Sequence, residues 1–129
     1  MTSKRQSVII KCRKLLLQIV KIERGEMCEI CGKTANLGLF HILPVGRYPR
    51  IQLYKQNVLI AGWYCCHFKW HHDFFKARDI IAPRIIELRG ENYEEDLIKQ
   101  DAIAPKLSLA YLQILHAALA VELKSLSQT

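Results

Sequence analysis

Residues 28–72 open with Cys28-Glu29-Ile30-Cys31-Gly32-Lys33 and close with Cys65-Cys66-His67-Phe68-Lys69-Trp70-His71-His72. This stretch contains four of the chain's five cysteines and four of its five histidines. In the first motif two thiolates can point at one ion, while the glycine lets backbone amides turn toward the sulfur atoms. The second motif is a cluster of further sulfur and nitrogen ligands. We therefore expect a zinc ion held between the two motifs to organise the fold.

Length and composition restrict the class of protein. A chain of 129 residues, half of them hydrophobic, can form one domain with a core, although a structural metal would help so small a unit. No apolar run approaches the roughly 20 residues that span a bilayer, so we expect no membrane partner. The N-terminal residues do not have the pattern of an export signal, so we expect no export. An odd number of cysteines, two of them spaced for metal, favours the reducing cytoplasm over a disulfide scaffold.

Positive charge is concentrated in the first half of the chain. The net charge is +7, and residues 1–55 contain eleven Lys or Arg against three Asp or Glu. Residues 90–129 contain three against six. Because the basic half also carries the first metal-like motif, a polyanionic partner is favoured there, and nucleic acid is the commonest one.

Hydrophobic periodicity predicts the surrounding elements. Residues 4–24 have an amphipathic helical pattern in which Cys12 is a buried apolar residue rather than a ligand. Residues 37–43 suit a strand, and 51–54 with 58–61 suit a second strand and its continuation. A helix is expected from Cys65 toward Ile81, with an interruption at Pro83. A short helix is expected over residues 93–100, and a long last helix over residues 105–126.

These elements predict a single α+β domain. An N-terminal helix over 1–26 precedes a zinc-stapled ββα core over 27–82, and a helical tail over 83–129 follows. The last helix is most simply explained by core or dimer packing.

The order of the motifs resembles the phage lambda NinG (Rap) recombination nucleases, within the HNH or ββα-metal (treble-clef) group. In that family a basic helix precedes Cys-x-x-Cys-Gly, a motif histidine, a basic loop with an asparagine, and a second metal knuckle. Here the corresponding residues are Cys28 and Cys31, His41, Arg50, Asn57, Cys65 and His72. The resemblance implies a cytoplasmic enzyme of a bacterial host cell that acts on DNA.

The chain departs from the family pattern at two positions. The spacing from Asn57 would place the first cysteine of the second knuckle at Gly62, and Phe40 replaces a small residue. With Cys28, Cys31 and Cys65 as three thiolate ligands, the fourth would be Cys66 or His67. An alternative alignment reads Cys66-His67-x-x-x-His71 as the group's Cys-His-x-x-x-His, which makes Cys66 the third thiolate and His71, instead of His72, the catalytic ligand.

Phosphodiester hydrolysis explains why these residue types are needed. His41 would be the general base, because a neutral imidazole can take a proton from water. His72 or His71 would hold a catalytic Mg²⁺ or Mn²⁺, and Asn57 would orient the His41 loop. Phosphate contacts are expected from the basic side chains Arg47, Arg50 and Lys69.

Two classes of function follow. The first is a metal-dependent DNA endonuclease that acts on branched or structured recombination intermediates, for which a homodimer is an attractive arrangement. The second is a noncatalytic, zinc-stapled DNA-binding module in which Phe40 and Gly62 mark a decayed HNH site.

Overall fold

The first helix has the predicted bounds. The computed structural model describes residues 2–128, and its first element is α1, Lys4–Arg24. The Ser3 side chain accepts a hydrogen bond of 3.1 Å from the Gln6 amide at its start. Gly25 ends the helix at a φ of 98°, a backbone conformation that glycine adopts without a Cβ penalty. The cap residues and the apolar stripe together set the two ends of α1.

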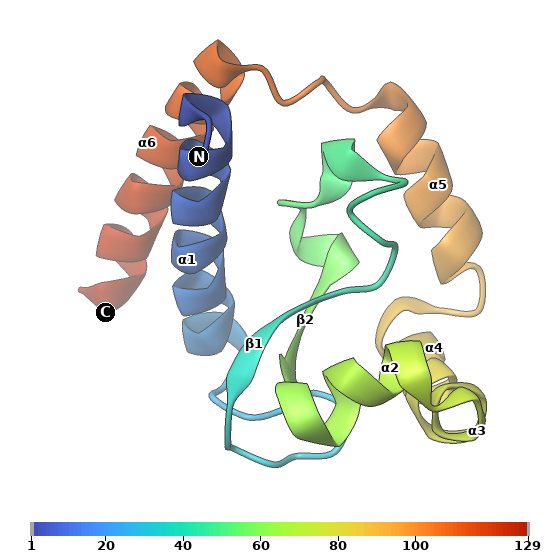
Figure 1. The fold of residues 1–129 in the computed structure, drawn as a ribbon. Coiled ribbons are helices and arrows are strands. Elements are labelled where there is room, and N and C mark those ends of the chain that lie inside the picture. The colour runs from blue at the N-terminus through green and yellow to red at the C-terminus, as the bar shows by residue number, and fades with distance from the viewer. Residues whose placement is uncertain (1, 129) are drawn as a thin grey trace.

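A two-stranded sheet follows, and mostly helical segments surround it (Figure 1). Strand β1, Leu37–His41, pairs antiparallel with β2, Val58–Gly62. The later helices are α2, Phe68–His72; α3, Phe74–Lys76; α4, Ala82–Arg89; α5, Tyr93–Ile103; and α6, Leu109–Ser127. Short 3-10 turns cover Pro49–Ile51 and Lys55–Asn57, and π-helical turns cover Trp63–His67 and Ala77–Ile81. The α+β class is therefore confirmed.

Strand β2 separates two hydrophobic clusters. Because strand side chains alternate between faces, Val58 and Ile60 pack with α1 and α6, whereas Leu59 and Ala61 pack with Ile81, Ile85 and Leu97. In β1, Leu39 lies opposite Ile60 and His41 lies opposite Val58. The register therefore places His41 on the face of the hairpin that points toward α1.

Several predicted element boundaries were wrong. Residues 51–54 do not extend the second strand, because the Gln52 and Tyr54 amides donate to the Pro49 and Ile51 carbonyls and curl the segment into turns. Pro83 does not interrupt the helical region but lies in the first turn of α4, where its missing N–H needs no partner.

The helical region breaks instead at Asp73, whose side chain accepts a 3.0 Å hydrogen bond from the Lys76 amide. The last helix begins at Leu109 rather than Pro105, because the Ser108 side chain caps it through the Tyr111 amide.

Helix α6 lies alongside α1 and buries Leu112 and Leu119 (Figure 1). Its opposite side exposes Ile114 and Val121. Among the helices of residues 2–128, α6 is the one long and apolar enough to cross a membrane by length and composition alone. A single helix of this kind is weak evidence for a membrane, since a core helix of a soluble protein passes the same test.

Candidate metal centre and histidine cavity

Four cysteine sulfur atoms gather at one end of the hairpin. The Sγ atoms of Cys28, Cys31, Cys65 and Cys66 all lie within 4.8 Å of one another. Tetrahedral zinc with Zn–S bonds of about 2.3 Å requires sulfur separations of about 3.8 Å. The Cys31 and Cys65 sulfur atoms are closer than this, at 3.2 Å, and the largest separation in the cluster is at most 4.8 Å, so small side-chain shifts would complete the coordination shell. These four cysteines can therefore bind a metal such as zinc.

The first cysteine pair is presented by a tight turn docked on β2. The Cys28 carbonyl accepts from the Gly32 amide at 2.8 Å, and Gly32 has a φ of 80° that favours glycine. Glu29 fastens the turn to the sheet, because its amide donates to the Ile60 carbonyl at 2.8 Å and its carboxylate accepts from the Ile60 amide at 2.6 Å. One backbone and one side-chain hydrogen bond of Glu29 thus hold the turn on β2 without a metal ion.

The second pair comes from the π-helical turn directly after β2. A tight turn at this point brings two consecutive cysteines, Cys65 and Cys66, to the same cluster. Of the two candidates for the fourth ligand, Cys66 joins the cluster and His67 does not. His67 instead packs its ring against Phe40, with centroids 5.4 Å apart.

Thiol acidity differs within the cluster. Burial acts to raise the pKa of Cys31, but the Lys33 amide and the neighbouring thiols outweigh it and lower that pKa to about 7. Burial is the main cause that raises the pKa of Cys65 and of Cys66, followed by their thiol neighbours. A divalent cation would reverse this effect, because it stabilises thiolates and releases their protons.

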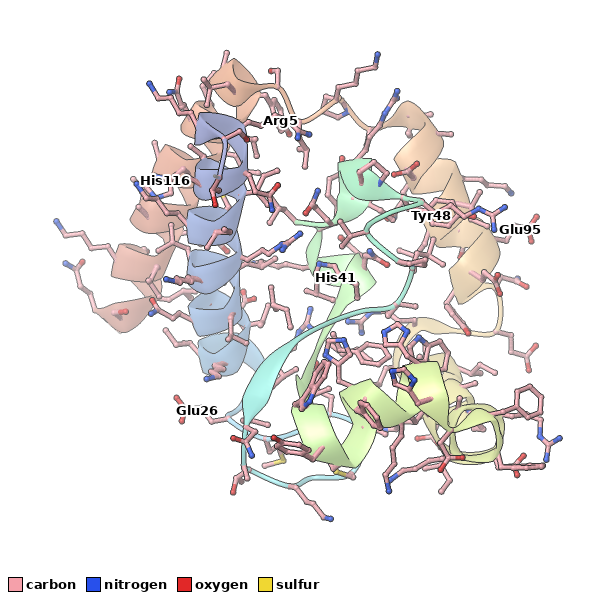
Figure 2. The ribbon with its side chains drawn as sticks, in the orientation of Figure 1. Arg5, Glu26, His41, Tyr48, Glu95 and His116 are labelled. Carbon is pink, nitrogen blue, oxygen red and sulfur yellow. The ribbon has the colours of Figure 1, made fainter. Side chains whose placement is uncertain are left out.

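His41 is the last residue of β1 and is half-buried (Figure 2). Its Nε2 lies 2.8 Å from the Gln52 carbonyl oxygen, and since a carbonyl only accepts, Nε2 carries the proton and Nδ1 keeps its lone pair. Burial lowers the pKa of His41 to about 4, helped by the charges of Arg13 and His67 and opposed by the Gln52 carbonyl. The imidazole is therefore neutral at neutral pH.

A cavity of about 300 Å³ brings His41 together with the helix that follows β2. Among its lining residues are His71 of α2, Trp70, Tyr93 and Glu94. His72 does not line this cavity, and its ring stacks near Phe68 with centroids 4.3 Å apart. Of the two predicted ligands for a catalytic ion, His71 is the one placed beside His41.

Asn57 is fully buried and clamps the chain just after His41. Its Oδ1 accepts from the Leu43 amide at 2.8 Å, and its Nδ2 donates to the Leu43 carbonyl at 3.3 Å. Asn57 thus fixes the loop rather than contacting the imidazole.

The three predicted phosphate contacts lie in separate places. The Arg47 guanidinium stands over the Tyr48 ring at 5.8 Å, and Arg50 bonds the Ala104 carbonyl at 3.4 Å. Lys69 lines a cavity of about 210 Å³ whose other cations are Lys33 and Lys76. No one cavity described within residues 2–128 contains all three predicted contacts.

Sequence reasoning missed two residues that border His41. Gln52 orients the imidazole through its carbonyl, and Arg13 donates to the Gln52 Oε1 at 2.6 Å. Gln52 carried no usable signal, because its role depends on a turn that was expected to be a strand. Arg13 did carry a signal, since it interrupts the apolar stripe of α1 between the buried Ile9 and Leu16.

Comparisons with protein-family models, with curated proteins and with solved structures found no match to this chain.

Proposed function

We propose that this protein is a metal-dependent endonuclease that hydrolyses phosphodiester bonds in branched or structured DNA, such as recombination intermediates. The observation that carries the proposal is the shared cavity of His41 and His71, on the two elements that flank the four-cysteine cluster. The cysteine cluster would hold structural zinc, and the histidine cavity would receive the scissile phosphate.

The protonation state of His41 suits a general base. Because Nε2 donates to the Gln52 carbonyl, Nδ1 is the atom that can accept a proton from an attacking water. A base with a pKa of about 4 is weak, but a bound phosphate would place negative charge nearby and raise that pKa toward the working range. Asn57 would position His41 by holding the chain at Leu43.

The donor set near His41 fits a second cation. His71 offers an imidazole nitrogen, and Glu94 offers the carboxylate oxygen that Mg²⁺ or Mn²⁺ prefers. Such an ion would polarise the phosphate and stabilise the leaving oxygen. Both residues are exposed, so an ion and a phosphate can reach them from solvent.

Cleavage assays test the proposal directly. Wild-type protein with Mg²⁺ or Mn²⁺ should nick duplex, branched or single-stranded DNA, and His41→Ala should lower that rate by roughly a hundredfold or more. His116→Ala on α6 is the matched control, because it removes a histidine far from the cavity (Figure 2). Zinc content should be the same in all three proteins.

A noncatalytic, zinc-stapled DNA-binding module is the second candidate. The half-buried position of His41 and its low pKa favour it, because both features also describe a structural histidine. Wild-type protein that binds DNA but cleaves none of the three substrates, or a His41→Ala variant that cuts as fast as wild type, would replace the nuclease proposal with this one.

A further inference from the structure

A second cavity borders His41 on the side of α1. It has a volume of about 350 Å³ and lies between α1, β1 and the turn after β2. Its lining residues are Arg13, Lys14, Leu17, Leu39, His41 and His67. The strand register explains this arrangement, because Leu39 and His41 share the face of β1 that points toward α1.

Arg13 carries a positive charge in this cavity without a counter-ion. Among the residues that the structure describes, the Arg13 side chain donates one hydrogen bond, of 2.6 Å, to the neutral side chain of Gln52, and its Nε is buried without a partner. Within residues 2–128 no carboxylate pairs with it. A half-buried guanidinium with an unsatisfied N–H is costly, so proteins normally supply a negative group for it.

The residues that line the cavity with Arg13 include one further cation and no acidic side chain. Lys14 is exposed, and within the described residues it forms no ion pair. The two titratable side chains that complete the lining are imidazoles, His41 and His67. A concave site with cations and no acid attracts an anion.

We propose that Arg13 and Lys14 form a binding site for a backbone phosphate of nucleic acid, next to His41 and on the first helix of the chain. The inference rests on the proposed function and deepens it, because it names the surface along which the substrate backbone approaches. His41 lines both this cavity and the one that contains His71. A strand held by the two cations therefore has a phosphate within reach of the imidazole.

The two side chains suit different parts of this task. The guanidinium of Arg13 can donate two parallel hydrogen bonds to phosphate oxygens, once a ligand orients its free N–H groups. Lys14 is an exposed residue of the cavity lining, and its charge sits on a long, flexible stem that can follow a moving backbone. Because both contact phosphate rather than bases, the site should not distinguish DNA sequences.

Binding measurements on a cleavage-deficient background test the site without relying on catalysis. We would titrate a fluorescent branched DNA with zinc-loaded His41→Ala protein, and compare it with the same protein carrying Lys14→Ala. We expect the second substitution to weaken binding roughly threefold to tenfold and to reduce the salt slope by about one. Lys4→Ala is the matched control, since it removes the same charge from α1 about 15 Å along the helix axis.

Arg13→Gln is the second variant, because glutamine removes the charge but keeps a polar side chain at this position. It should weaken binding at least as much as Lys14→Ala while leaving zinc content unchanged. If the Arg13→Gln variant does not fold, the comparison of Lys14→Ala with Lys4→Ala decides whether the phosphate site exists.

The possible outcomes separate this inference from the nuclease proposal. Active wild type whose Lys14→Ala and Arg13→Gln variants bind and cleave normally would overturn the phosphate site and leave the nuclease standing. Inactive wild type whose DNA affinity still depends on Lys14 would support the site and overturn the nuclease. Equal losses from Lys4→Ala and Lys14→Ala would also overturn it, because only the total charge would then matter. A failure of both wild-type and His41→Ala protein to bind DNA would likewise overturn the phosphate site.

Discussion

Gly62 and Cys65 approach each other so closely that a Cβ on residue 62 would lie 2.5 Å from the Cys65 sulfur. The same Cβ would lie 3.2 Å from the Ala35 carbonyl oxygen. The position where the motif spacing predicted a cysteine therefore has no room for a side chain while Cys65 points into the cluster. Glycine at position 62 and cysteine at position 65 are complementary features of one site.

Gly62→Ala should lower the affinity for zinc while largely preserving the secondary-structure content. The Cys65 side chain can rotate away from the new methyl group, but its sulfur would then leave the cluster. We expect at least a tenfold loss in zinc affinity, measured by competition with a chromophoric chelator. Gly38→Ala on β1 is the control, because a Cβ there meets nothing within 4 Å. Equal zinc affinity in the two variants would contradict this account of Gly62.

Zinc removal should destabilise the region around the hairpin. Cys28 and Cys66 are part of a hydrophobic cluster as well as of the sulfur cluster, so metal binding and folding are coupled there. We expect one zinc per chain by elemental analysis, and a Cys28→Ala variant should lose the metal and melt at least about 10 °C lower.

Cys12→Ala is the control for cysteine chemistry. Cys12 is buried in α1 in the other hydrophobic cluster, so its loss should affect packing but leave zinc content unchanged. Purified protein without zinc, with a disulfide between Cys28 and Cys31 in its place, would refute the metal site.

The contrast between α1 and the 51–57 region shows what sequence patterns can and cannot establish. The bounds of α1 follow from local signals, a serine cap and a terminal glycine, which act within one turn of the helix. The motif spacing indicated Cys28, Cys31 and Cys65 as ligands but left the fourth open between Cys66 and His67, and the fold brings Cys66 to the cluster. Residues 51–53 are buried although they form turns, so their apolar character resembled that of a strand. The pairing of Arg13 with Gln52 spans 39 residues and depends on that fold.

Folding stability should depend on the protonation of His41. Its pKa is about 4 in the folded protein and about 6.5 in the unfolded chain, so between these values the unfolded state binds more protons. The free energy of unfolding should therefore fall as pH decreases from 6.5 to 4, by up to about 3 kcal/mol from this residue. His41→Gln removes the titration while its amide can still donate to the Gln52 carbonyl.

The difference between the two unfolding curves isolates His41, because both proteins contain the same cysteine cluster and acidic residues. Denaturant unfolding at pH 7, 6, 5 and 4.5 measures it. Parallel pH profiles for wild type and His41→Gln would show that the imidazole is not held neutral by its surroundings.

Substitution of the two neighbouring histidines of α2 should give different responses to the catalytic ion. His71 lines the cavity with His41, whereas His72 stacks beside Phe68 and does not line it. If His71 holds the ion, His71→Ala should raise the Mn²⁺ concentration required for half-maximal cleavage by roughly tenfold or more, because a ligand has been removed. His72→Ala should change this concentration by less than about twofold. Zinc content and DNA affinity should stay constant in both variants. The opposite pattern, with the larger effect at His72, would restore the alignment in which His72 is the ligand and would move the catalytic ion away from the His41 cavity.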